Sequence, residues 1–191
     1  MHVGALIFPT DRTIRADVLA PALEDRGYES FWVAEHTHIP LSRRTPYPGG
    51  GDLPDMYWRT MDPFVSLAAA AVVTERLKLG TGICLVNQHH PINMANQAAS
   101  VDHLSAGRFL FGVGVGWNED EMEHHGVDPA KRRSAARERI LATRVLWTEH
   151  PAEFHGEYVD FGPSASFPNR PRPSPRGVRR WGSRRTRRRW S

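Results

Sequence analysis

Four short apolar runs alternate along the chain with four segments whose apolar residues recur at helical spacing. We predict that the apolar runs are strands at residues 2–8, 30–35, 77–86 and 108–113. Two parallel strands need a long crossover between them, usually a helix, so this alternation predicts a parallel sheet. Regular β-α alternation is typical of two architectures, a doubly wound sheet and a (β/α)8 barrel.

Residues that start and stop helices separate the helical segments, which we expect at about residues 14–26, 62–76, 91–106 and 128–148. Thr10, Asp11 and Thr13 offer side-chain oxygens that could cap the first helix at its N-terminus. Gly27 follows the same helix as a C-cap signal. Asp62, followed directly by proline, predicts the start of the second helix.

Two parts of the chain fall outside this alternation. The connection at residues 37–61 holds four prolines and three glycines, and a loop of that length inside a compact domain is usually functional or mobile. After Glu149 the alternation stops, and the apolar residues from Phe154 to Phe161 predict a short strand pair. Residues 168–191 offer no plausible fifth strand.

The charges are distributed unevenly. Residues 163–191 contain ten arginines and no acid, so the rest of the chain has 15 basic against 21 acidic residues, a net charge of −6. An acidic body lacks the basic face that binds nucleic acid, and we expect no nucleic-acid partner. The arginine-rich end could bind phosphates or RNA, or it could be an exposed segment without a folded role.

Composition narrows the cellular setting. No run of about 18 apolar residues exists, so we expect no membrane span. The first residues are typical of a strand and lack the pattern of a secretory signal peptide. Cys84 is the only cysteine, which excludes an internal disulfide and fits a reducing, cytoplasmic compartment.

Three motifs carry a resemblance to a known family. They are Phe-Trp-Val-Ala-Glu-His at residues 31–36, Gly-Thr-Gly-Ile-Cys-Leu-Val-Asn-Gln-His-His-Pro at residues 80–91, and the stretch from Asp-His-Leu-Ser-Ala-Gly-Arg to Gly-Val-Gly-Val-Gly-Trp-Asn-Glu-Asp-Glu at residues 102–121. In this order and spacing the chain resembles the luciferase-like monooxygenases, and within them the oxidoreductases that use coenzyme F420. Residues 152–161 are similar to the family segment that precedes the fifth strand.

The resemblance implies a TIM-type (β/α)8 barrel, of which about the first four β-α units are present in residues 1–167. A complete barrel usually needs about 250 residues. We expect residues 168–191 to be a non-native or disordered tail, as a frameshift near residues 168–175 would produce. The resemblance therefore also leaves open an inactive half-barrel fragment, whose open sheet edges would invite pairing with another chain.

The resemblance also implies the site residues. His36, with Glu35, stands where the family has a catalytic or ring-contacting histidine, and imidazole exchanges protons near neutral pH. Family members back the cofactor ring with a bulge that contains a non-proline cis peptide, which we expect near Gly82–Ile83. The implied cofactor-binding residues are Thr81, Gly82, Ile83, Cys84, Gly114, Gly116, Trp117 and Asn118.

Several alternatives compete with these assignments. Cys84 is expected to be a buried structural residue. The alternative is a nucleophile, but the sequence shows no base paired with it. The glycine-rich stretch 112–118 could bind a dinucleotide, but the acids that follow it would repel a pyrophosphate. We expect no metal, because the histidines lack a recognisable ligand pattern such as HExxH.

The expected reaction is hydride transfer between F420 and a small organic substrate. FMN with oxygen activation is the alternative, and oxygen consumption separates the two. The sequence does not fix the oligomeric state and leaves a homodimer open.

Overall fold

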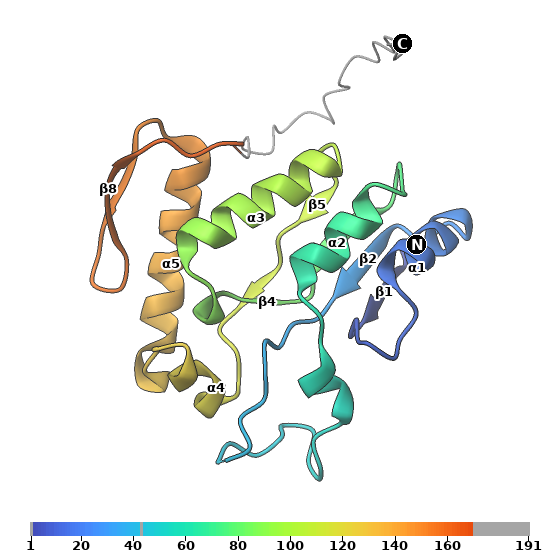
Figure 1. The fold of residues 1–191 in the computed structure, drawn as a ribbon, viewed down its shortest axis with the longest axis horizontal. Coiled ribbons are helices and arrows are strands. Elements are labelled where there is room, and N and C mark those ends of the chain that lie inside the picture. The colour runs from blue at the N-terminus through green and yellow to red at the C-terminus, as the bar shows by residue number, and fades with distance from the viewer. Residues whose placement is uncertain (1, 43, 170–191) are drawn as a thin grey trace, which may run out of the picture.

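The computed structural model describes residues 2–42 and 44–169, which form an α/β fold around a parallel sheet (Figure 1). The sheet has four strands, each parallel to its neighbour, and the predicted parallel sheet is confirmed. Their order across the sheet is β1 (Gly4–Ile7), β2 (Ser30–Val33), β3 (Lys78–Thr81) and β5 (Phe109–Leu110). Among the described residues, β1 and β5 are therefore the edge strands.

Four helices cover one face of this sheet. They are α1 (Ala16–Asp25), α2 (Pro63–Ala71), α3 (Pro91–Leu104) and α5 (Arg132–Thr148). Each helix contacts the next along the chain, and α2 and α3 cross in front of the strands in Figure 1. Helices and strands thus follow the same spatial order, as repeated β-α units require.

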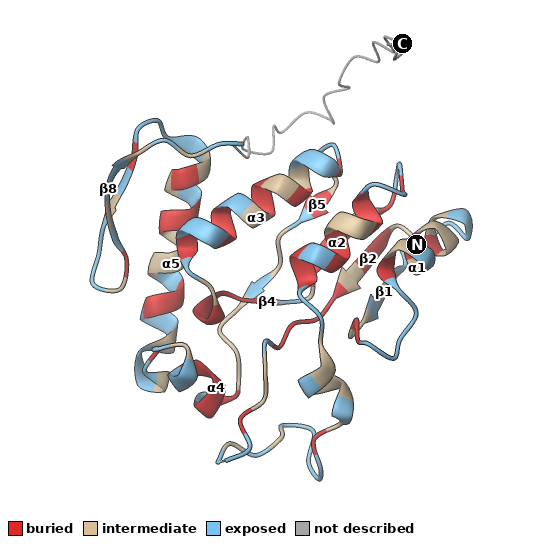
Figure 2. Cartoon of the chain, viewed as in Figure 1, coloured by how far each residue is buried: buried red, intermediate tan, exposed pale blue. Residues whose placement is uncertain are grey.

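The core lies between the helices and this face of the sheet, where buried residues gather in Figure 2. Phe31 and Leu79 from the strands are fully buried and pack in one cluster with Leu67 of α2 and Met94 of α3. The opposite face is open within the described residues, because Leu6 is 57% exposed and Leu110 is 37% exposed. Whether further strands close this sheet into a barrel stays a prediction.

The third and fourth predicted strands are each interrupted. β3 is followed by β4 (Cys84–Leu85), and β5 is followed by β6 (Val113–Gly114). β4 and β6 pair with each other in parallel as a separate two-stranded sheet. The peptide bond between Gly82 and Ile83, which lies between β3 and β4, is cis, and this prediction is confirmed.

The first helix begins later than we predicted. It starts at Ala16, and its N-cap residue is Arg15, which makes no side-chain capping bond. The predicted cap is wrong because the threonines bond to each other instead, with the Thr10 amide donating to Thr13 Oγ1 at 2.8 Å. The C-cap prediction is confirmed, since Gly27 has a φ of +76° directly after the helix.

The second helix begins as predicted, with the Asp62 side chain accepting a hydrogen bond from the Val65 amide at 2.8 Å. We expect Asp62→Ala to lower the free energy of unfolding by about 1 kcal/mol, because an amide at the helix start loses its acceptor. Urea denaturation measures this change. Asp62→Asn keeps an acceptor and serves as the matched control, so an equal loss in both variants would contradict the capping role.

The second helix ends at Ala71, five residues before the predicted Arg76, because Arg108 takes up the carbonyl groups that follow. Its guanidinium donates to the carbonyl oxygens of Ala71, Thr74 and Leu77 at 2.7–3.0 Å. It also donates to the Ser105 carbonyl at the end of α3. Arg108 thus joins the C-terminal ends of two helices to the start of β3.

We expect Arg108→Met to lower the free energy of unfolding by about 3 kcal/mol, because several carbonyl groups lose a charged donor at once. Chemical denaturation monitored by circular dichroism measures the loss. Arg144→Met on the exposed side of α5 is the control and should change stability by less than about 0.5 kcal/mol. Equal losses of stability in the two variants would show that the bonds from Arg108 to these carbonyl groups do not stabilise the fold.

The remaining elements lie between or after the β-α units. The predicted strand pair is confirmed as an antiparallel hairpin of β7 (Ala152–His155) and β8 (Asp160–Ser164). The sequence did not predict helix α4 (Glu119–His124) or the 3-10 helices η1 (Asp55–Arg59), η2 (Val86–Gln88) and η3 (Pro129–Lys131). Among the described residues, no helix is long and apolar enough to cross a membrane.

Candidate functional site

A cavity of about 400 Å³ opens where β2, β4 and β6 end. Its walls come from strand ends and from the long loop between β2 and α2, and most of the lining is apolar or glycine backbone. The lining residues are Phe8, Ala34, Glu35, His36, Tyr57, Gly82, Ile83, Leu85, Val115, Gly116 and Trp117. A cavity at the carboxyl ends of parallel strands is the usual place for a ligand site in α/β folds.

A buried imidazole–carboxylate pair lies at this cavity. Nδ1 of His36, three residues after β2, lies 2.9 Å from Oε2 and 3.1 Å from Oε1 of Glu121 in α4. The side chains are 6% and 1% exposed. Because Glu121 occupies Nδ1, the other ring nitrogen, Nε2, is the one that His36 can offer to a molecule in the cavity.

Aromatic side chains surround this histidine. The rings of Tyr57 and Trp117 lie 5.0 Å and 5.9 Å from the His36 ring, measured between ring centres. Burial, together with the hydrogen bond to Tyr47, raises the pKa of Tyr57 to about 12. Tyr57 therefore stays a neutral phenol near physiological pH, and the cavity wall beside His36 is aromatic and uncharged.

Glu35 is the other acid at the cavity, and its oxygens already have partners. Oε2 accepts a hydrogen bond from the Leu85 amide at 2.5 Å, and Oε1 lies 2.6 Å from Nε2 of His89. Burial, and then the nearby Glu35, raise the pKa of the Cys84 thiol well above its usual range. Cys84 is fully buried and protonated, which agrees with the structural role rather than the nucleophile.

Glycines let two backbone segments, at residues 81–83 and 112–116, approach each other closely beside the cavity. A Cβ added at Gly112 would lie 2.3 Å from the Thr81 carbonyl oxygen, and one at Gly114 would collide with the Ile83 side chain. Gly116 has a φ of +83°, in the left-handed region that favours glycine. The close approach places Ile83 and the backbone around Gly116 on the same cavity wall.

The sequence pattern of the luciferase-like monooxygenase family matches residues 11–183. The chain belongs to the luciferase-like monooxygenase family. The match extends beyond residue 167, where we predicted a domain boundary. Since residues 170–191 lie outside the described part of the structure, the predicted tail remains a prediction.

Related sequences agree with this family. The chain is 48% identical to an uncharacterised protein of Mycobacterium tuberculosis over 171 residues, which are 88% of this chain and 61% of the relative. It is 36% identical to a 4-hydroxyprotoasukamycin monooxygenase of Streptomyces nodosus subsp. asukaensis, over 70% of this chain and 32% of the relative. The chain therefore spans about three fifths or less of the length of these curated relatives.

Solved structures of similar fold span both flavin and deazaflavin proteins. The monooxygenase RslO1 from Streptomyces bottropensis matches with a TM-score of 0.73 and 27% identity, over 88% of this chain and 50% of that one. A 3,6-diketocamphane monooxygenase component from Pseudomonas putida, in complex with FMN, gives 0.67 and 22%, over 85% and 43%. The coenzyme F420 dependent tetrahydromethanopterin reductase of Methanopyrus kandleri gives 0.62 and 23%, over 87% and 46%.

The luciferase-like fold brings together part of the predicted site. Both predicted catalytic residues, His36 and Glu35, line the cavity. Of the predicted cofactor-binding residues, four line it: Gly82, Ile83, Gly116 and Trp117. The other four do not line it: Thr81, Cys84, Gly114 and Asn118. Asn118 caps α4, where its side chain accepts from the Glu121 amide, and Thr81 Oγ1 donates to the Gly112 carbonyl at 2.7 Å.

Sequence reasoning missed the carboxylate partner of His36. We treated Glu121 only as one of the acids that would repel a pyrophosphate, yet its side chain points into the interior and is almost fully buried. A signal was present, because Asn118 followed three residues later by Glu121 is a helix-start pattern. That pattern predicts helix α4, whose first turn carries Glu121 to His36.

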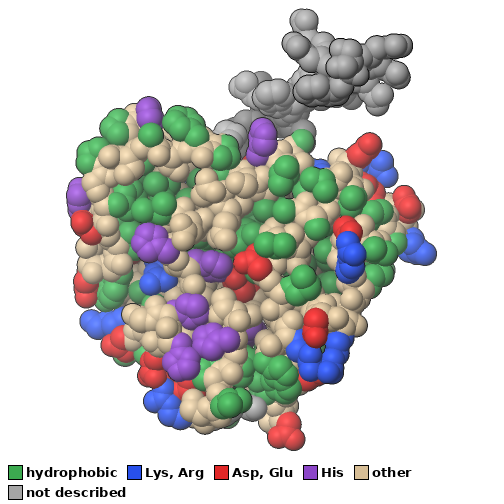
Figure 3. All heavy atoms as spheres, in the orientation of Figure 1, with side chains coloured by type: hydrophobic (Ala, Val, Ile, Leu, Met, Phe, Trp, Pro, Cys, Tyr) green, Lys and Arg blue, Asp and Glu red, His purple; other side chains and the backbone are tan. Residues whose placement is uncertain are grey.

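The loop at residues 37–61 is fastened to α4 beside the cavity. Ser42 Oγ and the Arg44 amide donate to the buried Asp120 carboxylate at 2.9 and 2.8 Å, and the Arg44 guanidinium pairs with Asp120 and Glu123. His38 of the loop stacks on His124, and several histidines gather near α4 in Figure 3. These contacts anchor the loop that also carries Tyr57.

Proposed function

We propose that this chain carries the site of an oxidoreductase that transfers a hydride between coenzyme F420 and a small organic substrate. The proposal includes a (β/α)8 barrel, of which the described sheet forms the first four strands. The observation that carries it is the buried His36–Glu121 pair, which faces a wall of glycine backbone and aromatic rings in one cavity. The family membership and the fold of the F420 dependent reductase support the cofactor class.

The residues present fit the ring of such a cofactor. Gly82 lines the cavity, and a Cβ added there would meet Leu6 at 3.0 Å. This position therefore has little room for a side chain and presents backbone to the ring. The cavity of about 400 Å³ lies within the usual range for small-molecule sites. Its lining contains no lysine or arginine, so the described residues around it would hold the ring rather than the phosphate groups.

We assign separate roles to the side chains in and beside the cavity. A bound deazaflavin or flavin supplies the two-electron hydride chemistry that amino-acid side chains lack. Glu121 fixes the orientation of the His36 ring and stabilises it when it carries a proton. His36 Nε2 then holds or delivers a proton at the substrate, while Tyr57 and Trp117 exclude water.

We assign Glu35 a positioning task. Its oxygens are bonded to the Leu85 amide and to His89, so Glu35 ties β4 to the end of β2 under the cavity. His36 follows Glu35 directly, and the fixed carboxylate therefore helps to place the imidazole. The four residues that do not line the cavity take a supporting task. Thr81 Oγ1 and the Cys84 amide donate to the Gly112 carbonyl, Gly114 pairs with Leu85, and Asn118 caps α4.

The second candidate is an FMN-dependent monooxygenase, which the names of relatives favour. The chain is 36% identical to a 4-hydroxyprotoasukamycin monooxygenase, and a camphane monooxygenase component of similar fold is in complex with FMN. The same pocket would then face a flavin ring and an oxygenated small substrate. A third interpretation, an inactive half-barrel fragment, follows if either cofactor needs barrel strands beyond the four described here.

Cofactor titration separates these readings. The chain is titrated with F420 and with FMN in separate experiments, and bound cofactor is followed by fluorescence. We expect F420 to bind at least about tenfold more tightly than FMN, a difference of about 1.4 kcal/mol. Tighter FMN binding with substrate-dependent oxygen consumption would replace the F420 proposal with the monooxygenase. Binding of neither would overturn both and leave the fragment.

Trp117→Ala is expected to weaken binding of the preferred cofactor at least about tenfold, because one aromatic wall of the cavity is lost. The same fluorescence titration measures the dissociation constant. Trp58→Ala is the matched control, since Trp58 lies in η1, next to the lining residue Tyr57, but is 48% exposed and does not line the cavity. An unchanged constant for Trp117→Ala would place the ring elsewhere.

A further inference from the structure

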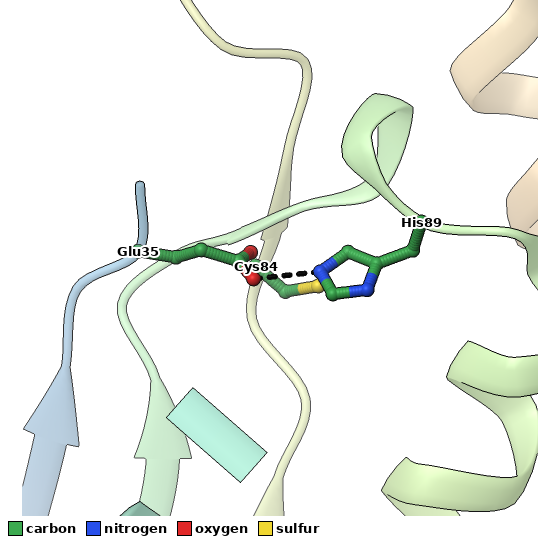
Figure 4. A group of neighbouring side chains, drawn as sticks. All are labelled: Glu35, Cys84 and His89. Atoms are coloured by element: carbon green, nitrogen blue, oxygen red, sulfur yellow. Dashed lines mark hydrogen bonds and ion pairs between the residues drawn. The ribbon is translucent and has the colours of Figure 1, made fainter. Parts of the chain in front are cut away.

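Three side chains that can bind metal ions converge behind the cavity (Figure 4). They are Glu35 after β2, Cys84 in β4 and His89 before α3. One carboxylate oxygen, the thiol sulfur and one imidazole nitrogen all lie within 4.8 Å of one another. Within the described ranges, no other group of three His, Cys, Asp or Glu side chains meets this condition.

We infer that Glu35, Cys84 and His89 form a binding site for a divalent cation of the zinc type. Oxygen, sulfur and nitrogen ligands from Glu, Cys and His are the set that zinc takes in proteins. The ligand atoms of a tetrahedral zinc ion lie roughly 3.3–3.8 Å apart, and these three atoms lie within 4.8 Å of one another, with the 2.6 Å contact between His89 Nε2 and Glu35 Oε1 lengthening when the ion enters.

Burial and charge also suit a metal ion. The side chains of Glu35, Cys84 and His89 are 2%, 0% and 11% exposed, so a bound ion would be shielded from most of the solvent. A divalent cation with one carboxylate, one thiolate and one neutral imidazole has a net charge of zero. Such a group is far less costly to bury than an isolated charge.

The surroundings supply support and access. The second Glu35 oxygen accepts from the Leu85 amide, a contact that orients the carboxylate as outer contacts do in metal sites. Glu35 also lines the cavity, which gives an ion and a water molecule a route to the fourth position. Binding releases the thiol proton of Cys84 to solvent, and His89 exchanges its hydrogen bond with Glu35 for a bond to the metal.

The single cysteine makes the test direct. The intact 191-residue chain, kept reduced, is titrated with Co²⁺ in a buffer free of chelators, and the near-ultraviolet and visible absorbance is recorded. Because Cys84 is the only cysteine, a thiolate-to-cobalt charge-transfer band can come from no other residue. We expect this band to saturate at one equivalent of Co²⁺ and to disappear when Zn²⁺ displaces the cobalt.

Variants assign the remaining ligands. Cys84→Ser should remove the band, and His89→Gln should weaken Zn²⁺ binding by more than about tenfold, the least that even an outer contact to a metal site contributes. The double variant His38→Gln/His124→Gln is the control, because it removes an exposed histidine pair that could also bind these metal ions. It should leave the charge-transfer band intact. Circular dichroism checks that each variant is folded.

Absence of the charge-transfer band in the wild-type chain would overturn the inference, whether Co²⁺ binds elsewhere or not at all. If His89→Gln bound Co²⁺ and Zn²⁺ as tightly as the wild-type chain, His89 would not be a ligand of the site. The experiment uses metal alone, so its result is independent of whether the chain binds F420 or FMN.

Discussion

His36→Ala is expected to lower the free energy of unfolding by about 4 kcal/mol, within the range found when one partner of a buried charged, hydrogen-bonded pair is removed. The reason is the residue left behind. Glu121 is 1% exposed, and His36 is the partner that its carboxylate bonds among the described residues. Without His36 the buried carboxyl group of Glu121 loses the side-chain partner that compensates for its burial. Urea denaturation, with the slope checked against wild type, measures the loss.

A double variant separates this cause from simple loss of packing. His36→Ala/Glu121→Gln should be more stable than His36→Ala, because a buried amide costs less than a buried carboxylate. His155→Ala is the surface control, since His155 also pairs with a carboxylate but both side chains are mostly exposed, and its unfolding midpoint should barely move. A His36→Ala variant as stable as this control would contradict the buried pair. Under the proposed function, His36→Ala also lowers turnover by about 10²–10⁴-fold.

Gly112→Ala is expected to destabilise the chain by about 3 kcal/mol, near the upper end for overpacking. A Cβ at this position would lie 2.3 Å from the Thr81 carbonyl oxygen, and the obstacle is backbone that cannot rotate away. The Gly112 carbonyl also accepts from Thr81 Oγ1 and from the Cys84 amide. Any shift that relieves the collision therefore disturbs the contacts between the two interrupted strands.

Thermal and urea unfolding of Gly112→Ala measure this effect, and Gly162→Ala is its matched control. An added Cβ at Gly162 meets no atom within 4 Å, so that change should leave stability within about 0.5 kcal/mol of wild type. A Gly112→Ala variant that unfolds like Gly162→Ala would show that the two strands separate more easily than the structure implies. Cofactor binding by a folded Gly112→Ala chain should also fall, since Gly112 lies behind the cavity wall.

The sequence alone determined the order of elements and the position of the break in the third strand. Hydrophobic periodicity is local, and it placed four strands and four helices because each element has one face to bury. The family resemblance predicted a bulge with a cis peptide near Gly82–Ile83, and the cis bond there confirmed it. The family motifs at His36 and Gly116 also marked residues that line the cavity.

Element boundaries were less certain, because tertiary contacts compete with local signals. Thr10 and Thr13 have good capping side chains, yet they bond to each other, and the first helix begins at Ala16. The helix after Asp62 ends at Ala71 because Arg108, distant in sequence, takes the carbonyl groups that would have continued it. Both outcomes depend on partners that periodicity does not reveal.

Only the tertiary structure decided which charged side chains meet. Glu121 lies 85 residues from His36, and Cys84 and His89 lie about fifty residues from Glu35, separations at which spacing carries no distance information. Parallel strands and their crossovers bring these positions to one edge of the sheet. In sequence the acids of residues 119–123 formed one charged run, whereas in the fold Glu121 turns inward to His36 and Glu123 stays at the surface. The orientation of each acid depends on which side of α4 faces the interior of the fold, and no local pattern specifies this.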